Sequence, residues 1–89
     1  MPTISRFFGI AIRMYWEAGN PHHRPHFHAY YQDYAAVFAI DDLSLLGGAL
    51  PERQMRYVLS WAREHGNELE ENWVRLWSGR TAQQIDPLS

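Results

Sequence analysis

The amino-acid sequence predicts an α+β fold, in which a small antiparallel sheet of three or four strands is followed by a C-terminal antiparallel helix pair packed on one face. The first half of the chain alternates apolar and polar residues, which is typical of strands. The second half spaces its apolar residues three and four apart, which is typical of amphipathic helices. A chain of 89 residues has room for one hydrophobic core, so we expect a single domain over residues 1–89.

The first element is expected to be a strand over residues 7–16. Phe8, Ile10 and Ile12 alternate there with smaller or polar residues, so they share one face of the strand. The residues that follow, 17–25, include glycine, asparagine and proline, which predict a loop.

The next two elements are expected to be the strands of a β-hairpin, over residues 26–31 and 34–40. Gln32 and Asp33 separate them, which is the spacing of a two-residue turn, and aspartate tolerates the positive φ that such turns require. In this register residue 31 pairs with residue 34. The side chains that then share one face of the first hairpin strand are His26, His28 and Tyr30.

A short fourth strand is expected within residues 43–50, an apolar run that contains two adjacent glycines. Pro51 follows at the first position of a helix, where proline is favoured. This helix is expected to end near Gly66 and to pack on the sheet face that carries Phe8, Ile10 and Ile12. Its apolar stripe consists of Met55, Val58, Leu59 and Ala62.

A second helix is expected to begin at Asn67, because Asn67 and Glu70 have the spacing of a capping box. It is expected to stop before Gly79 and to fold back against the first helix. Residues 81–89 have no apolar periodicity and predict an extended tail. The apolar stripe of this helix consists of Leu69, Trp73, Leu76 and Trp77.

Composition excludes several kinds of chemistry. The chain has no cysteine, so disulfides and thiolate sites are excluded and a reducing compartment is favoured. All eight basic residues are arginine, which excludes lysine chemistry, and the net charge of −2 argues against strong general attraction to nucleic acids. No apolar run is long enough to cross a bilayer, so we expect a cytoplasmic protein without a membrane partner.

Several segments together resemble a bacterial family of unknown function, the DUF family numbered 4160. The resemblance implies a small prokaryotic protein whose gene lies beside that of another small protein, an arrangement suggestive of toxin–antitoxin pairs. The implied partner is therefore a small protein encoded by a neighbouring gene. The segments that carry the resemblance are residues 1–10, residues 25–30, Leu50-Pro51, Glu68-Leu69 with Asn72-Trp73, and residues 85–88.

Three interpretations of the histidine segment are open. His26 and His28 leave the same face of a strand about 6–7 Å apart, a spacing that suits a divalent metal. They can instead be catalytic, with a histidine as general acid or base on a phosphodiester and an arginine binding the phosphate. They can also be half-buried side chains that bond loop carbonyls. The further candidate metal ligands are His22, His23, Asp33 and Asp41, and the candidate phosphate ligands are Arg24 and Arg13.

Two aromatic groups are candidate contact surfaces. Tyr30, Tyr31 and Tyr34 flank the expected hairpin and can stack unpaired bases or belong to the core. Tyr57 and Trp61 lie off the main stripe of the first helix, so they are candidate contacts for a partner protein. Trp61, like Trp73 and Trp77, can also pack between helix and sheet, which is the favoured interpretation for these tryptophans.

The leading hypothesis for function is a protein-interaction component of a two-gene, toxin–antitoxin-like module. The sequence contains no complete catalytic set, such as a glycine-rich phosphate loop or a helical His-Glu metal motif, so an enzyme is not favoured. The alternatives are a small histidine-dependent nuclease or metal-binding enzyme centred on the PHFH motif at residues 25–28, and an RNA-binding module. No cofactor is indicated other than a divalent metal at the histidines.

Overall fold

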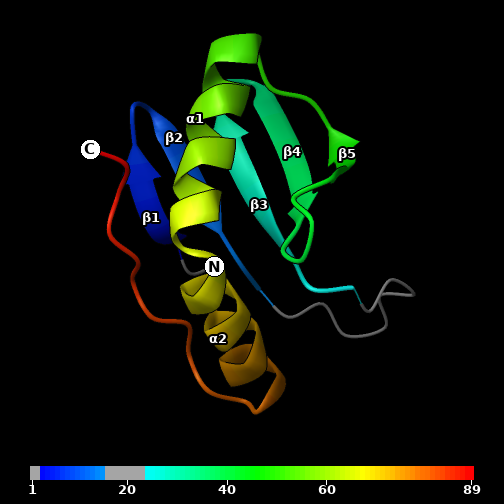
Figure 1. Cartoon of the computed structure of the whole chain (residues 1–89), viewed down its shortest axis with the longest axis vertical. Coiled ribbons are helices and arrows are strands. Elements are labelled where there is room, and N and C mark those ends of the chain that lie inside the picture. Colours follow the sequence, from blue (N-terminus) through cyan, green and yellow to red (C-terminus); the bar gives the residue numbers. More distant parts are fainter. Residues whose placement is uncertain (1–2, 16–23) are drawn as a thin grey trace.

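A computed structural model describes residues 3–15 and 24–89. It shows five strands followed by two helices, which confirms the α+β class and adds a strand to the three or four expected (Figure 1). Each strand pairs antiparallel with the next, in the spatial order β1-β2-β3-β4-β5. The elements are β1 (Thr3–Phe7), β2 (Ile10–Arg13), β3 (His26–Tyr31), β4 (Tyr34–Ala39), β5 (Leu45–Gly48), α1 (Glu52–Glu64) and α2 (Gly66–Trp77).

The single strand expected over residues 7–16 is wrong, because the chain turns within it. Phe8 and Gly9 have φ values of 49° and 77° and form a two-residue turn between β1 and β2. This turn pairs Phe7 with Ile10, so Phe7 joins the core while Phe8 is 55% exposed. Gly9 was the signal for the turn, because glycine adopts a positive φ without a steric penalty.

The hairpin of β3 and β4 has the predicted register. Tyr31 pairs with Tyr34 across the turn, and His28 pairs with Val37. The residue with a positive φ is Gln32, at 52°, rather than Asp33. The predicted fourth strand is present as β5, which pairs with β4 and forms one edge of the sheet.

Helix α1 lies across one face of the sheet, as its apolar stripe predicts (Figure 1). Val58 and Ala62 are buried, whereas Met55 and Leu59 are only partly buried at the margin of the core. The centre of the contact is Trp61, whose ring centroid lies 5.4 Å from that of Phe7 and 6.0 Å from that of Phe27. The helix therefore packs through a broader face than the predicted stripe.

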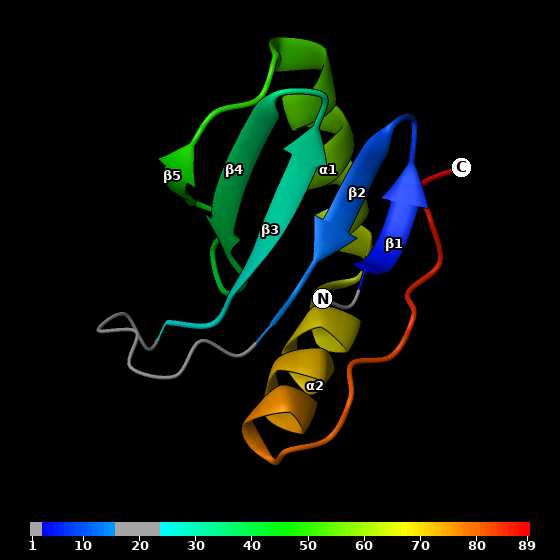
Figure 2. The same ribbon diagram turned by 180° about the vertical axis from the view of Figure 1, so that it is seen from behind.

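The two helices do not form the expected antiparallel hairpin. His65 alone joins them, and one residue cannot reverse the direction of a chain between two helices. Helix α2 instead continues beyond the end of the sheet (Figures 1 and 2). The expected capping box is also absent: α2 begins before Asn67, and His65 Nδ1 lies 2.6 Å from Glu68 Oε1. Neither helix combines the length and the apolar character needed to span a bilayer, among the residues described.

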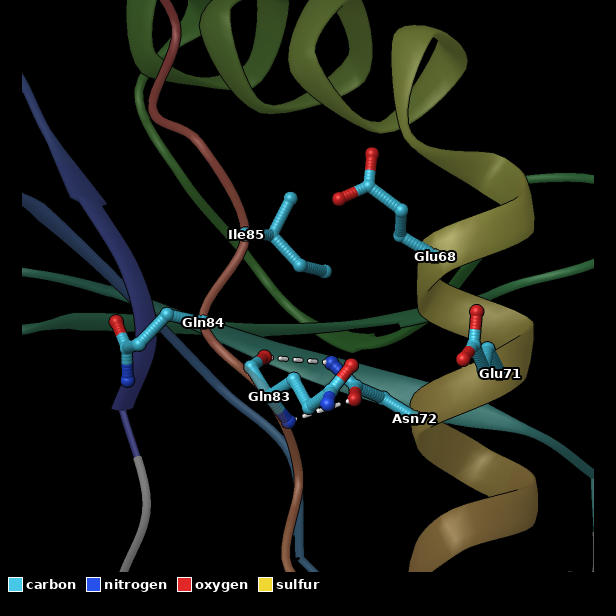
Figure 3. A pocket seen from close by; sticks show the side chains of 6 residues that line it. All are labelled: Glu68, Glu71, Asn72, Gln83, Gln84 and Ile85. Atoms are coloured by element: carbon cyan, nitrogen blue, oxygen red, sulfur yellow. Dashed lines mark hydrogen bonds between the residues drawn. The ribbon is translucent and has the colours of Figure 1, made fainter.

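The C-terminal segment, residues 78–89, has no helix or strand and runs back beside α2 and β1 (Figure 2). Ile85 is buried in the core and its N–H donates to the carbonyl of Ile4 on β1 at 2.8 Å. Buried Asn72 on α2 donates to the carbonyl of Gln83 at 2.9 Å and accepts from the N–H of Gln83 at 2.8 Å (Figure 3). The segment therefore covers the outer edge of β1.

We expect Asn72→Ala to lower the free energy of unfolding by about 1–3 kcal/mol, because two hydrogen bonds to the segment are lost at about 0.5–1.5 kcal/mol each. Urea denaturation measures this loss, and limited proteolysis reports whether residues 78–89 become accessible. Asn72→Asp keeps the acceptor and loses the donor, so it should fall between the alanine variant and the wild type. Unchanged stability in Asn72→Ala would contradict the anchoring role.

Candidate functional site

His26 is held at the start of β3 by contacts on two sides. Its side chain is 6% exposed and its ring centroid lies 5.1 Å from that of Trp73 on α2. Its Nδ1 lies 2.9 Å from the carbonyl oxygen of Arg24, and because a carbonyl only accepts, Nδ1 carries the proton. Of the three interpretations of the histidine segment, this geometry agrees with the one in which a histidine side chain hydrogen-bonds a loop carbonyl.

His28 lies in a cluster of rings on the other side of the sheet from α1. Its ring is stacked on Tyr15, with centroids 4.6 Å apart, and lies parallel to Tyr30 at 6.2 Å. The hydroxyl of Tyr15 lies 3.5 Å from His28 Nδ1 and 3.4 Å from the hydroxyl of Tyr30. Arg13 completes the group, with its Cζ 5.2 Å from the centroid of the Tyr30 ring. We call these four residues, Arg13, Tyr15, His28 and Tyr30, the aromatic cluster.

A metal site at His26 and His28 needs a third ligand, and none of the described residues supplies one. The two rings are close, with centroids 5.2 Å apart. Asp41 is paired with Arg24, and Asp33 lies in the turn at the opposite end of the hairpin. Residues 3–15 and 24–89 contain no group of three histidines or carboxylates that could hold a metal ion. His22 and His23 lie outside the described residues.

Arg24 is engaged by two carboxylates. Its Nη2 lies 2.9 Å from Asp41 Oδ1 and 2.9 Å from Asp42 Oδ1. The backbone N–H and side chain of Ser44, together with Arg24, lower the pKa of Asp42 from 3.8 to about 2. Asp42 therefore stays ionised until the pH falls to about 2, and its partner Arg24 has its charge offset at neutral pH. Arg24 is therefore poorly placed to bind phosphate, the role predicted for it. Arg13, the other predicted phosphate ligand, pairs with no carboxylate in the described part of the chain.

The two predicted partner contacts on α1 differ in exposure. Trp61 is 0% exposed and its indole N–H donates to the carbonyl of Asp86 at 2.8 Å. A surface role for Trp61 is therefore wrong, because its ring fills the core. Tyr57 is partly buried and its ring centroid lies 4.8 Å from that of exposed Phe8.

A surface that sequence reasoning missed lies along β5. Leu45 and Leu46 are 47% and 43% exposed although they are adjacent in one strand. No strand in the described part of the chain pairs with the outer edge of β5, whereas the outer edge of β1 is covered by Ile85. The signal in the sequence is the apolar run within residues 43–50, which predicts a strand but not its position at the edge of the sheet. We call Leu45, Leu46 and the unpaired backbone beside them the β5 edge.

A small pocket lies between α2 and the C-terminal segment (Figure 3). Its volume of about 30 Å³ is roughly that of one water molecule, far below the hundreds of cubic ångströms of a typical ligand site. Neither His26 nor His28 lines it, so it does not extend the histidine segment into a cleft. The lining residues are Glu68, Glu71, Asn72, Gln83, Gln84 and Ile85.

Comparison with known families gives one finding. Residues 9–74 match the family model described as "Domain of unknown function (DUF4160)". The match extends from the turn before β2 into α2, so it includes the β5 edge and all four residues of the aromatic cluster. No curated protein and no solved structure matches the chain.

Proposed function

The chain belongs to the DUF4160 family, whose description assigns no activity, and we propose that it is a protein-interaction component of a two-gene, toxin–antitoxin-like module. Its partner is a small protein encoded by a neighbouring gene. The observation that supports this proposal is a difference between the two edges of the sheet. One edge is covered by the chain's own C-terminal segment, whereas the other, the β5 edge, is apolar and has no paired strand among residues 3–15 and 24–89.

The β5 edge has the chemistry that strand addition requires. An edge strand presents unpaired backbone N–H and C=O groups, and an extended partner segment can pair with them as a further strand. Leu45 and Leu46 are both exposed, so both can meet apolar side chains of the partner. Because a little under half of each leucine is exposed, its burial adds about 0.7–1.5 kcal/mol for each side chain.

A nuclease or metal enzyme centred on the PHFH motif has less support from the geometry. His26 is anchored to a backbone carbonyl and packed on Trp73, and Arg24 is occupied by Asp41 and Asp42. A general acid or base needs a position from which it reaches a bound substrate. His26 has little exposed surface from which to do so.

Charge at the β5 edge is expected to weaken complex formation. The protein is co-expressed with the product of the neighbouring gene, and affinity is measured by calorimetry on the purified pair. The double variant Leu45→Lys/Leu46→Lys should weaken binding by more than about 2 kcal/mol, roughly thirtyfold, as hot-spot residues do. The control is Val74→Lys, which places one lysine at an exposed apolar site on α2. Equal affinity of the double variant and the control would remove the proposal.

His28→Ala serves as a second control on the same complex. If the protein acts by binding, a folded His28→Ala variant retains its partner affinity and its effect on growth. If the protein is a nuclease, loss of a general acid or base lowers the cleavage rate about a hundredfold to ten-thousandfold. RNA cleavage by the wild type that disappears in folded His28→Ala would replace the binding proposal with the enzyme.

A further inference from the structure

The C-terminal segment is held against the rest of the protein mainly through its backbone. Asn72 on α2 bonds both the carbonyl and the N–H of Gln83, at 2.9 and 2.8 Å (Figure 3). Trp61 on α1 donates to the carbonyl of Asp86 at 2.8 Å. Hydrogen bonds of this kind depend on the path of the segment and little on the identity of its side chains. The two helices therefore bind the segment as an extended chain.

The third side of this contact is β1, which receives one apolar anchor. The N–H of Ile85 donates to the carbonyl of Ile4 at 2.8 Å. Ile85 is also the only buried side chain of residues 78–89. The contact thus takes an extended chain with one aliphatic side chain, which is the chemistry of strand addition. We call the groups of Ile4, Trp61 and Asn72 that hold the segment the segment site.

The segment leaves α2 through a turn built on Gly79. Gly79 has a φ of 78°, and the N–H of Arg80 donates to the carbonyl of Arg75 at 2.8 Å, a pattern that ends helices. Ser78, Gly79 and Arg80 are all exposed, so backbone bonds rather than packing hold the turn. Glycine adopts many backbone conformations at little cost. A change of φ and ψ at Gly79 therefore redirects the whole segment while the sheet and both helices stay in place.

We infer that two copies of the protein exchange their C-terminal segments, so that the segment of each copy occupies the segment site of the other. A second copy is the occupant with the required chemistry, because its segment presents the same backbone groups and the same isoleucine in the same order. Every contact of the segment forms again between the copies, and only the turn at Gly79 changes. Exchange of an identical element is for this reason a low-cost route to a dimer.

The exchange goes beyond the proposed partner and does not rest on it. Strands β1 and β5 form opposite edges of the sheet, so the exchanged contacts do not involve the β5 edge of either copy. The dimer then carries two β5 edges, and a partner that has two matching segments binds it with avidity.

The turn provides the first test. Gly79→Ala strains the closed turn, because a residue with a Cβ is disfavoured at a φ of 78°, although nothing lies within 4 Å of the added Cβ. Exchange opens the turn in both copies and relieves this strain. The dimerisation constant should rise about fivefold to thirtyfold for each turn, as measured by sedimentation equilibrium after refolding from urea. The matched control, Gly66→Ala, adds a methyl group to open space without a positive φ and should dimerise as the wild type does.

The segment site is tested with a fluorescein-labelled peptide of residues 80–89 and the full-length Ile85→Asp variant. A carboxylate disfavours burial of the variant's own anchor, so its segment site is open to the peptide. The peptide should bind this variant at least about tenfold more tightly than the wild type, whose site is occupied by its own segment. Addition of Asn72→Ala should weaken peptide binding about five- to hundredfold, because two hydrogen bonds are lost.

The dimer itself should disappear in Ile85→Asp and persist in Leu45→Lys/Leu46→Lys, because the exchange needs the anchor and not the β5 edge. Thermal melts verify that each variant is folded. If Ile85→Asp does not fold, the comparison of Gly79→Ala with Gly66→Ala still decides. The inference is overturned if these two glycine variants dimerise alike, if the dimer survives Ile85→Asp, or if that variant binds the peptide no better than the wild type. Loss of the dimer in Leu45→Lys/Leu46→Lys would equally overturn it, by placing self-association at the β5 edge.

Discussion

Replacement of Trp61 by alanine is expected to lower the free energy of unfolding by about 3–5 kcal/mol, the usual cost of deleting a buried large aromatic side chain. The indole is fully buried and packs on Phe7 of β1 and Phe27 of β3. Its N–H also holds the C-terminal segment through the carbonyl of Asp86. The substitution therefore removes a contact that joins helix, sheet and C-terminal segment, and urea denaturation measures the loss.

A pair of variants separates packing from hydrogen bonding at this position. Trp61→Phe keeps an aromatic ring and loses the N–H, so it should cost only about 1–2 kcal/mol. Val74→Ala, at an exposed position on α2, should change stability by less than about 0.5 kcal/mol. A loss for Trp61→Ala no larger than that for Trp61→Phe would show that the ring does not fill the core.

The burial of Trp61 also shows that apolar periodicity does not predict every core residue of a helix. The stripe of Met55, Val58 and Ala62 predicted correctly that α1 packs on the sheet. A tryptophan beside such a stripe is large enough to reach the same core, and its buried N–H requires an acceptor. That acceptor, Asp86, is 25 residues further along the chain. No local pattern connects the two, so the sequence also allowed Trp61 as a candidate surface contact beside its expected packing in the core.

The hairpin could be predicted from local sequence, whereas the edges of the sheet could not. The register of β3 and β4 was predictable because a two-residue gap and alternating side chains determine it locally. The place of β5 at an open edge was not predictable, because it depends on the order of all five strands and on Ile85 covering β1. The aromatic cluster was found in part. His28 and Tyr30 share a face by their spacing, but Arg13 joins them from the end of β2 and Tyr15 from two residues beyond it.

Replacement of Gly48 by alanine is expected to destabilise the sheet at β5 by about 2–5 kcal/mol. Gly48 has a φ of 74°, a conformation that costs a residue with a Cβ about 1–2 kcal/mol. An added Cβ would also collide with the carbonyl oxygen of Ala35 and lie 2.9 Å from its carbonyl carbon, and such overpacking costs about 1–3 kcal/mol more. Gly47→Ala is the matched control, because nothing lies within 4 Å of its added Cβ.

Because both glycines belong to β5, the pair also tests the proposed partner surface. Displacement of β5 in Gly48→Ala would misplace Leu45, Leu46 and the unpaired backbone, so partner affinity should fall together with stability. Gly47→Ala should leave both nearly unchanged, since its backbone and its surroundings accept a methyl group. The comparison requires urea denaturation and calorimetry on the same preparations. Full partner affinity in a Gly48→Ala protein that has lost the β4–β5 pairing would place the partner on another surface.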